Sequence, residues 1–592
     1  MPHNANFINR LYLVMTNNLS KRQLMGVLAA FVGLGSGFAA VLLKNMVHFI
    51  SYELHTFSSN EYQNYIYIFA PVVGILLTIW FIKFILRRPV GHGVPGILHA
   101  ISRNNGYLAA HKMFSSLITS TFTVGFGGSV GLEGPIVGTG AAIGSNVGRK
   151  FGLSRKQVGT LIGCASSGAV AAIFNAPIAG IVFSLEILML DLTFSSLIPL
   201  LIASASAVVT SYFFTGNDIL YKFTVLNTFQ LNDLLYYVFL GVFTGLISVF
   251  FARVYRSMDT RFEQIKNTYV RLLFGGLLLG VLVFFFPALY GEGYNEINQA
   301  LSGNISYLFE RSLFYGFMDE IWVIIILLFA VTMFKAFATA ATFGAGGIGG
   351  IFAPALFIGA NAGLLFSKVA NLTGLHTISE RNFALVGMAG LIAGVLHAPL
   401  FAIFLIADIS GGYSLFLPLM ITSVFAYVIV KYFEPNSVYT YQLAKRKELI
   451  THDKDKSVLN LMTIDSLIEN NFSTVLATAT LGEFLNILVQ SKRNVFPVVD
   501  EENNLQGIVF INDIRHIILN KSLYDKVVMR DLMYMPSPLV HPDESMEEVA
   551  KKFQTTSHYN LPVVKDGKYV GFISRANMFS TYRKIIQDFS EE

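Results

Sequence analysis

Two glycine-rich segments of the chain carry almost the same residues and lie 219 positions apart. Residues 127–135 read GGSVGLEGP and residues 346–354 read GGIGGIFAP, with Glu133 in the first where Phe352 stands in the second. A helix broken by glycines inside a membrane leaves backbone N–H groups that must face protein, water or a ligand. The N-terminal end of a half-helix carries partial positive charge and suits an anion. Two matched breaks with one carboxylate predict an ion pathway, unless the glycines only allow close helix packing.

Glu133 is the residue with the clearest chemical consequence. A carboxylate within a membrane is energetically costly and is by default functional. Its negative charge opposes an anion at the same helix end, so we expect it to block the anion site when ionised and to withdraw when protonated. The alternative is a carboxylate that only satisfies nearby backbone N–H groups.

A second pair of matched segments follows the first. Pro177 precedes Glu186 by nine residues, and Pro399 precedes Asp408 by nine residues. The two prolines are 222 positions apart, close to the first spacing of 219. Because the two acids occupy equivalent positions, we interpret them as hydrogen-bonding partners of backbone groups at helix ends rather than as proton carriers.

The repeats divide the apolar part of the chain into two halves, approximately residues 20–215 and 230–440. Residues 148–156 contain four basic residues and no acid, whereas their counterpart, residues 368–381, contains two basic residues and Glu380. An excess of Lys and Arg marks cytoplasmic loops. The two loops are therefore expected on opposite sides of a membrane, which favours inverted repeats.

The overall composition is that of a membrane protein. Of 592 residues, 53% are hydrophobic and only 13% are charged, with a mean hydropathy of +0.56. The net charge of +5 gives no sign of nucleic-acid binding, and the single cysteine, Cys164, excludes a disulfide framework within one chain. Several apolar runs are long enough to span ~30 Å of hydrocarbon as helices. These runs are residues 24–50, 66–86, 197–214, 234–251, 272–286, 321–334 and 415–430.

The N-terminal segment, residues 1–23, contains Arg10, Lys21 and Arg22 and no acidic residue. By the positive-inside tendency we expect it to be cytoplasmic. The first apolar run is too long for a signal peptide and has no small-residue cleavage pattern, so we expect no cleaved leader.

The composition changes after residue 443. Residues 444–456 are strongly charged and read as a linker between an apolar domain, residues 24–443, and a soluble region. The soluble region repeats, because Asn494-Val495-Phe496-Pro497 resembles Asn560-Leu561-Pro562 and the prolines are 65 residues apart. Each unit reads as helix, strand, turn, strand, helix. We therefore expect two small α/β domains, at residues 457–520 and 521–592.

Other chemistry is not supported by the sequence. His92, His99 and His111 have no metal-ligand spacing, and the chain shows no nucleophile triad, P-loop or dinucleotide fingerprint. We therefore expect neither an enzyme nor a metal protein. Lys335 lies in an apolar run, where we expect it to snorkel or to pair rather than to transport.

Together these elements resemble the CLC family of chloride channels and chloride/proton antiporters. The resemblance is carried by residues 91–95 (GHGVP), 131–135 (GLEGP) and 350–354 (GIFAP) and by Tyr439 after the last apolar run. It implies an α-helical polytopic fold of inverted repeats with broken helices, and a homodimer in the lipid bilayer with one anion pore in each subunit.

The resemblance also assigns roles to residues. The backbone amides of Ile351 and Phe352 and the hydroxyl of Tyr439 would coordinate the central anion, and Glu133 would be the gating glutamate at the external side. The backbone of Gly131, Gly134 and Gly350 would line the anion path.

Three residues depart from the family pattern. His92 replaces the central serine, where an imidazole can still donate a hydrogen bond to an anion. Leu132 replaces the arginine that usually precedes the gating glutamate. Ile187 replaces the internal proton glutamate of antiporters, and an apolar side chain cannot carry a proton. The last departure favours channel-type members, although some antiporters also lack this glutamate.

The C-terminal pair resembles tandem CBS domains, which can bind adenine nucleotides such as ATP, ADP or AMP. The usual ribose-binding pattern is Ser or Thr followed three residues later by an acid or amide. The second unit keeps Ser574 and Asn577, whereas the first has Phe510 in place of the hydroxyl and keeps Asp513. A purely structural, dimerising module is the alternative.

The sequence thus predicts a voltage-gated type of chloride channel, with passive conduction gated by Glu133 and no required cofactor. We expect it in the plasma (inner) membrane with both termini cytoplasmic. The alternative is proton-coupled chloride exchange on the same scaffold, and a remote one is a nucleotide sensor anchored by its membrane part.

Overall fold

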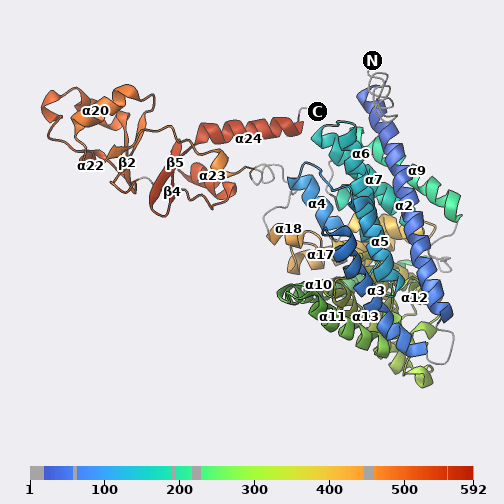
Figure 1. The fold of residues 1–592 in the computed structure, drawn as a ribbon. Coiled ribbons are helices and arrows are strands. Elements are labelled where there is room, and N and C mark those ends of the chain that lie inside the picture. Colours follow the sequence, from blue (N-terminus) through green and yellow to red (C-terminus); the bar gives the residue numbers. More distant parts are fainter. Residues whose placement is uncertain are drawn as a thin grey trace, which may run out of the picture. The chain divides into compact units, whose positions relative to one another are not determined.

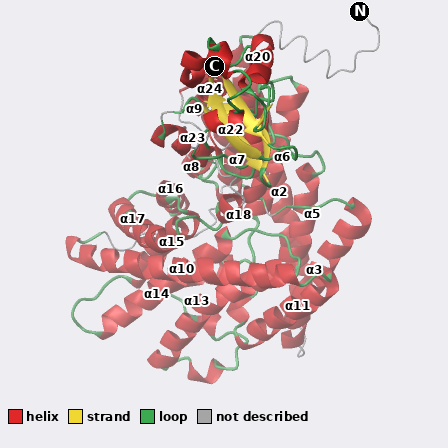
Figure 2. Ribbon diagram, turned by 90° about the vertical axis from the view of Figure 1, so that its left-hand side faces the viewer, coloured by secondary structure: helices red, strands yellow, loops and turns green. Residues whose placement is uncertain are grey.

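The computed structural model of the protein describes residues 19–57, 63–91, 93–188, 194–216, 229–445, 459, 462–535, 537–556 and 558–590. His92 and most of the linker predicted at residues 444–456 lie outside these ranges. The chain divides into two compact units, Met1–Leu449 and Ile450–Glu592. The named strands, drawn yellow in Figure 2, all belong to the second unit.

Helices build the described part of the first unit (Figure 1). Nine of the described helical spans are long and apolar enough to cross a membrane, which confirms the predicted polytopic helical fold. The first half contains α2 (Lys21–Phe57), α3 (Gln63–Trp80), α4 (Val94–Arg103), α5 (Lys112–Gly125), α6 (Glu133–Lys150), α7 (Arg155–Phe174), α8 (Pro177–Glu186) and α9 (Phe194–Thr215). The second half contains α10 (Leu234–Gln264), α11 (Thr268–Phe285), α12 (Tyr294–Ser302), α13 (Ile321–Gly344), α14 (Phe352–Leu372), α15 (Glu380–Leu396), α16 (Pro399–Ile409), α17 (Phe416–Phe433) and α18 (Tyr441–Lys445).

The two halves are related by an approximate two-fold axis. The Ser129 N–H donates to Thr342 Oγ1 at 3.2 Å, and the Ile348 N–H donates to Thr123 Oγ1 at 3.0 Å. Both the donors and the acceptors are 219 positions apart in the chain. A hydrogen bond and its counterpart between equivalent positions indicate that an approximate two-fold axis relates the halves. This relation agrees with the predicted inverted repeats.

The helices break at equivalent places in the two halves. Asn175 ends α7 with φ 53° and His397 ends α15 with φ 57°, both in the left-handed conformation that terminates helices. Pro177 and Pro399 then start α8 and α16, where a proline's fixed φ and missing N–H are tolerated. The Asn-Ala-Pro and His-Ala-Pro segments therefore encode the same short turn.

Small residues allow several helices of the core to approach closely. A Cβ on Gly37 in α2 would lie 2.6 Å from the carbonyl oxygen of Ala207 in α9. A Cβ on Gly359 in α14 would lie 2.6 Å from the Cα of Met388 in α15. At these positions the glycines serve helix packing, as small residues commonly do in membranes.

The second unit contains a three-stranded and a two-stranded sheet flanked by helices, and each sheet includes the antiparallel strand pair that the repeat predicts. Strand β1 pairs in parallel with β2, which pairs antiparallel with β3, and β4 pairs antiparallel with β5. Asp566 and Gly567 both have positive φ, which suits the tight turn between β4 and β5. The elements are β1 (Val475–Leu476), α20 (Leu481–Gln490), β2 (Val495–Val499), β3 (Leu505–Phe510), α21 (Ile511–Ile518), α22 (Met529–Leu532), α23 (Met546–Thr555), β4 (Asn560–Lys565), β5 (Lys568–Ser574) and α24 (Arg575–Ser590).

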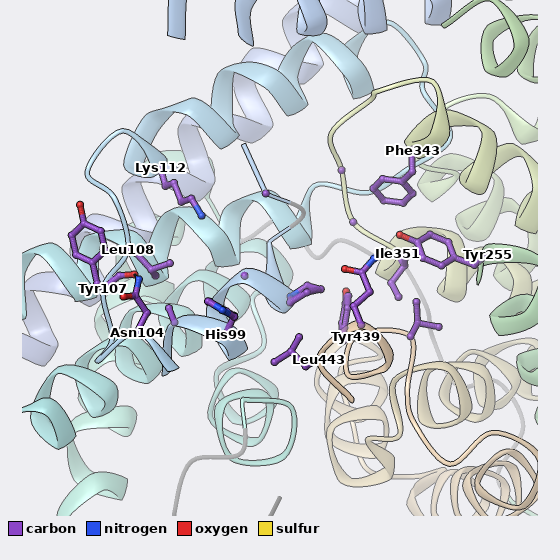
Figure 3. Close-up of a pocket in the computed structure, with 18 residues that line it drawn as sticks. His99, Asn104, Tyr107, Leu108, Lys112, Tyr255, Phe343, Ile351, Tyr439 and Leu443 are labelled. Atoms are coloured by element: carbon purple, nitrogen blue, oxygen red, sulfur yellow. The ribbon is translucent and has the colours of Figure 1, made fainter. Parts of the chain in front are cut away.

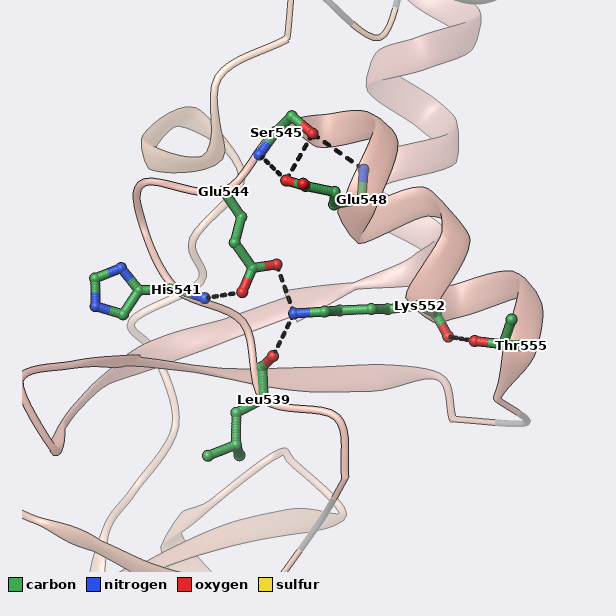
Figure 4. A network of polar contacts seen from close by, with 7 residues as sticks. All are labelled: Leu539, His541, Glu544, Ser545, Glu548, Lys552 and Thr555. Atoms are coloured by element: carbon green, nitrogen blue, oxygen red, sulfur yellow. Dashed lines mark hydrogen bonds and ion pairs between the residues drawn. The ribbon is translucent and has the colours of Figure 1, made fainter.

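The start of α23 is fixed by local polar contacts (Figure 4). Ser545 and Glu548 form a capping box, in which each side chain bonds the other residue's backbone N–H. Glu544 adds an ion pair to Lys552 at 2.5 Å. The same capping box recurs at Thr480 before α20, 65 residues earlier. The predicted sequence repeat therefore reappears in the helix caps.

Candidate anion-binding site

The N-terminal ends of α4, α6 and α14 meet inside the first unit. The Gly131 N–H donates to the Gly350 carbonyl at 2.8 Å and the Gly350 N–H donates to the Gly131 carbonyl at 2.7 Å. A Cβ on Gly134 would lie 3.0 Å from the Cα of Gly350, and a Cβ on Gly93 would collide with the carbonyl of Gly134. Glycine is required here because three backbones approach without room for side chains.

These three helix starts have no side-chain caps. The N-cap residues Gly93, Leu132 and Ile351 make no capping hydrogen bond. By contrast, Ser154 caps α7 and Ser379 caps α15. The first N–H groups of a helix need an acceptor, and the helix dipole favours a negative one. Three starts without side-chain caps around one point therefore make this place a candidate anion site.

Glu133 occupies this point of convergence. It is the first residue of α6 and its side chain is fully buried. Tyr294, at the start of α12, donates a hydrogen bond to Glu133 Oε1. The other oxygen, Oε2, has no hydrogen-bond partner and lies 3.5 Å from the position of a Cβ on Gly350. The carboxyl group thus lies over the Gly131–Gly350 bridge, where an anion would meet the helix ends.

A cavity of about 330 Å³ opens beside the same bridge (Figure 3). Gly349, Gly350 and Ile351 line it from the start of α14, and Tyr439 lines it from the segment before α18. Figure 3 shows His99, Lys112 and Tyr107 along the opposite part of the cavity wall. Its remaining lining residues are Gly91, Pro95, Gly96, Ala100, Asn104, Leu108, Tyr255, Phe343, Val438, Gln442 and Leu443.

Tyr439 brings a buried polar group to this cavity. Its hydroxyl has no hydrogen-bond partner, although the residue is only 6% exposed. Its ring lies 6.1 Å from the ring of Phe352, which also contacts the rings of Phe183 and Phe401. The predicted residues Ile351, Phe352 and Tyr439 therefore lie together, with one unpaired donor among apolar rings.

Lys112 is a residue of this cavity that the sequence did not single out. It begins α5, although a cation at a helix N-terminus opposes the dipole. Its Nζ lies 3.8 Å from the position of a Cβ on Gly91, the neighbour of His92. A lysine in this unfavourable helix position is the sequence signal that could have revealed it. His92 itself lies outside the described residues, although Gly91 lines the cavity.

The other two departures from the family pattern are apolar side chains in the interior. Leu132 is 3% exposed and directly precedes Glu133. Ile187 caps the C-terminal end of α8 and is 5% exposed within the main hydrophobic core. Neither position offers a charge or a proton to the anion path.

Glu186 and Asp408 bond backbone groups at helix ends, as we interpreted them. Glu186, at the end of α8, accepts from the N–H groups of Leu400 and Phe401 at the start of α16, at 3.2 and 2.6 Å. Asp408, near the end of α16, accepts from the N–H of Ile178 at the start of α8, at 3.2 Å. Each helix therefore supplies the other's missing N-cap, in a second reciprocal contact between the halves.

Lys335 is fully buried in α13 and is paired. Its Nζ donates to the carbonyls of Leu289 at 3.2 Å and Gly291 at 2.9 Å, and it lies 4.7 Å from the ring centre of Phe357. It therefore holds the segment between α11 and α12, which leads to Tyr294. Pairing rather than snorkelling is the observed arrangement.

In the second unit, the residues expected to bind a ribose already have partners. Ser574 donates to Glu469 Oε1 at 2.6 Å and accepts from the Asn577 N–H at 3.0 Å. Glu469 also pairs with Arg493 at 2.8 Å. At the equivalent place in the first repeat, Phe510 stacks on Tyr534 with ring centres 6.0 Å apart.

Comparison with known proteins agrees with this geometry. The profile of the voltage gated chloride channel family matches residues 73–431, and that of the CBS domain matches residues 464–520 and 529–583. A putative ClcB-like chloride channel protein of Ralstonia nicotianae is 29% identical over 392 residues, 64% of this chain and 86% of that protein. The voltage-gated ClC-type chloride channel ClcB of Escherichia coli (strain K12 / DH10B) is 26% identical over 444 residues, 73% of this chain and 100% of that protein.

Solved structures share the fold. A slow cyanobacterial Cl⁻/H⁺ antiporter superposes with a TM-score of 0.62 at 23% identity, over 72% of this chain and 99% of that one. A eukaryotic CLC transporter superposes with a TM-score of 0.61 at 19% identity, over 94% of this chain and 99% of that one. The chain therefore belongs to the voltage-gated chloride channel (CLC) family of multi-pass membrane transport proteins and carries a tandem CBS pair.

Proposed function

We propose that the protein conducts chloride passively and that Glu133 is its gate. The observation that carries this proposal is the position of the Glu133 carboxyl group, which covers the bridge between two uncapped helix starts. While ionised, the carboxylate takes the place of an anion. Protonation removes the charge that the helix ends attract, so the side chain leaves and chloride enters.

Chloride would be held mainly by uncharged donors. The backbone N–H groups of Ile351 and Phe352 are uncapped, and the Tyr439 hydroxyl is buried without a partner. An anion that accepts from these groups relieves the cost of leaving them unpaired. The backbone of Gly131, Gly134 and Gly350 would line the path, with His92 as a further donor.

Passive conduction is favoured over exchange by Ile187. Its buried apolar side chain cannot relay a proton from the inner side. The second candidate is chloride/proton exchange, which the name of the cyanobacterial structural neighbour supports. The two differ in whether chloride flow drives protons uphill.

Vesicle flux distinguishes these two modes. The purified chain is reconstituted in lipid vesicles under opposed chloride and proton gradients, and the internal pH is recorded. A channel lets chloride run down its gradient without moving protons. Sustained proton uptake driven by chloride would show that the protein is an exchanger and not a channel.

Glu133→Gln tests the gate itself. The amide mimics the protonated acid, so we expect chloride flux at neutral pH to rise to the level of the parent in acid and to lose its pH dependence. Glu263→Gln, which changes an exposed glutamate of α10, is the matched control and should keep the parental pH profile. If the pH profile of chloride flux is the same in Glu133→Gln and in the parent, Glu133 is not the gate.

We also propose the organisation of the whole protein. A homodimer would lie in the plasma (inner) membrane with both termini cytoplasmic, and chemical crosslinking in vesicles tests the dimer. The transport domain would be residues 24–443, the linker 444–456, and the CBS domains 457–520 and 521–592. No catalytic or cofactor role is proposed.

The CBS pair would bind an adenine nucleotide through Ser574 and Asn577, with Asp513 as the corresponding acid of the first repeat. Glu469 must release Ser574 for this to happen, because it accepts that residue's hydroxyl hydrogen. Calorimetric titration of the full chain with ATP, ADP or AMP tests the proposal, with Ser574→Ala as the variant expected to lose binding. If ATP, ADP and AMP all give no heat of binding, the CBS pair is better explained as a structural, dimerising module.

A further inference from the structure

A groove between the end of α10 and α11 opens on the surface of the first unit. Its volume is about 460 Å³, and both helices belong to described spans that are long and apolar enough to cross a membrane. On each helix the lining positions recur every three or four residues, so a single stripe of each helix faces the groove. The lining residues are Met258, Arg261, Phe262 and Ile265 from α10 and its C-cap, and Phe274, Leu277, Leu278 and Val281 from α11.

Large apolar side chains of α11 remain exposed along this groove. They include Phe274, Leu277 and Val281, which a membrane would surround with lipid. Val281 lies ten positions beyond Arg271 in the first turn of the helix, which corresponds to about 15 Å along a helix. This length is half of a ~30 Å hydrocarbon core. The exposed stripe is therefore about as long as one leaflet of a bilayer is deep.

The floor of the groove consists of side chains that pack against α13. Met258 and Phe262 of α10 belong to one buried cluster with Ala340 of α13. A Cβ on Gly344, at the end of α13, would collide with the ring of Phe262, so the two helices touch at this point. The neighbouring Phe343 lines the cavity of the candidate anion site. These contacts fix the floor, so a ligand would bind a preformed surface.

Two arginines give one end of the groove a positive charge. Arg261 lies in the last turn of α10, is exposed, and is the charged member of the described lining. Arg271 lies three positions before Phe274 and seven before Leu278, which places it on the same face of α11. Its Nε is buried and has no hydrogen-bond partner in the described part of the chain. The two arginines flank the short connection between the helices, residues 265–267.

The other charges near these helix ends do not neutralise the two arginines. Residues 253–271 contain five basic residues and two acidic ones, Asp259 and Glu263. Each acid follows a groove-lining position by one residue, so it lies on another face of α10. Glu434 pairs with two other arginines of α10, and no ion pair among the described residues involves either groove arginine. This end of the groove is therefore complementary to an anion.

We propose that this groove binds one anionic phospholipid, whose acyl chain lies along α11 and whose phosphate contacts Arg261 and Arg271. A guanidinium group can bond two phosphate oxygens at once, and the apolar stripe covers the chain. A zwitterionic lipid carries a compensating cation on its headgroup and gains less from the arginines. The basic connection places the site on the side that the proposed orientation makes cytoplasmic. Lipid binding at this place does not depend on the function proposed for Glu133.

A second groove on α10 resembles the first in size but not in charge. Its volume is about 430 Å³, and its described lining contains no charged residue. The lining residues are Tyr236, Phe239, Val242, Phe243, Leu246, Phe366, Ala370, Thr373 and Leu375. Because this groove offers an apolar surface without a cation, it is an internal control for the selectivity between lipids.

The test is native mass spectrometry of the full chain in detergent, with dioleoyl phosphatidylglycerol or dioleoyl phosphatidylcholine added. We expect the chain to bind phosphatidylglycerol more tightly. Arg261→Gln and Arg271→Gln should each weaken this binding about fivefold, which is the contribution of one basic residue beside an anionic headgroup, and leave the binding of phosphatidylcholine unchanged. Arg22→Gln removes an exposed arginine from the first turn of α2 and is the matched control, which should keep the parental affinity.

Two leucine substitutions test the position of the acyl chain. Leu277→Glu places a carboxylate in the first groove, so the preference for phosphatidylglycerol should disappear. Leu246→Glu makes the same change in the second groove, where the exposed leucine is also apolar lining, and should leave that preference intact.

Three kinds of result would overturn the inference. Equal affinity for the two lipids, or unchanged affinity in both arginine variants, would show that lipid only coats the groove. Equally tight binding of glycerol phosphate, which has the phosphate but no acyl chain, would show a site for free anions. Dissociation of a dimer by Leu277→Glu but not by Leu246→Glu would show that a second copy of the chain occupies the groove.

Discussion

The contribution of the Tyr439 hydroxyl group to chloride binding can be tested by one substitution. It is buried without a partner in the described part of the chain, and a buried unsatisfied donor costs about 1–3 kcal/mol. A bound chloride would remove that cost. We therefore expect Tyr439→Phe to weaken chloride binding about tenfold, which corresponds to ~1.4 kcal/mol, measured by calorimetric titration of the purified protein.

Tyr569→Phe is the matched control for this measurement. It removes a buried hydroxyl that also lacks a partner, but in the second unit. Its chloride affinity should equal that of the parent. Equal affinities for Tyr439→Phe and the parent would mean that Tyr439 does not contact the anion.

At the scale of residues, the sequence predicted the features that a local pattern of residues encodes. Glu133 and Phe352 do begin the two equivalent helices, because the glycines and prolines around them encode the helix starts. Tyr294 was not found, because it reaches Glu133 from 161 positions away and no spacing signals that contact. Lys112 was missed although its position at a helix start was a signal, because its cavity forms only when distant helices pack.

At the scale of elements, the reciprocal caps of α8 and α16 make a paired prediction. Replacing an N-cap acceptor typically costs about 1 kcal/mol. We expect Glu186→Ala and Asp408→Ala each to lower the stability of the solubilised protein by about this amount while the folded fraction still conducts. Thermal unfolding in detergent measures the change, with the exposed Glu547→Ala as control. Loss of pH-dependent flux at full stability would instead indicate a proton carrier.

The turn between β2 and β3 makes a pH prediction. Hydrogen bonds from the Asn504 side chain and backbone N–H, at 2.9 and 2.8 Å, lower the pKa of Asp500 below 3.8. A depressed folded-state pKa stabilises the fold above the unfolded-state pKa, and this stabilisation is lost as the pH falls through the folded-state value. Asp500→Asn should therefore unfold at lower temperature than the parent near neutral pH.

The comparison of Asp500→Asn with the parent at low pH is the control for this prediction. As the pH falls below the ordinary carboxyl range, the two unfolding temperatures of the second unit, followed by circular dichroism of the full chain, should converge. A constant difference at every pH would show that packing rather than ionisation of Asp500 is responsible.

The elements themselves were predicted where two signals coincided. The repeated Asn-Ala-Pro and His-Ala-Pro segments predicted the helix breaks. The charge difference between two loops predicted that the two halves have opposite orientations. The repeats alone could not reveal that α4 contributes a third uncapped start, although the family resemblance already pointed to residues 91–95. Gly93 has no counterpart in the repeated pattern, and its approach to Gly134 depends on tertiary packing.

At the scale of the whole molecule, the proposed orientation can be tested with introduced thiols. The chain has one cysteine, Cys164, which is buried, so the parent should resist a membrane-impermeant maleimide. Ser20→Cys and Lys565→Cys, at exposed positions of the two units, should react only after the cell membrane is opened. Asp319→Cys, before α13, should react in intact cells. The reverse pattern would invert the assigned topology.

The reciprocal bridge between Gly131 and Gly350 also limits how the length of the chain can vary. An insertion or deletion between Thr123 and Glu133 would displace one half of the bridge while the other half keeps its register. The spacing between the halves nevertheless grows from 219 at the first pair of motifs to 222 at the second. Length changes of this fold should therefore be tolerated in the connections after α6 and α14, whereas the segments that meet at the bridge must keep their length.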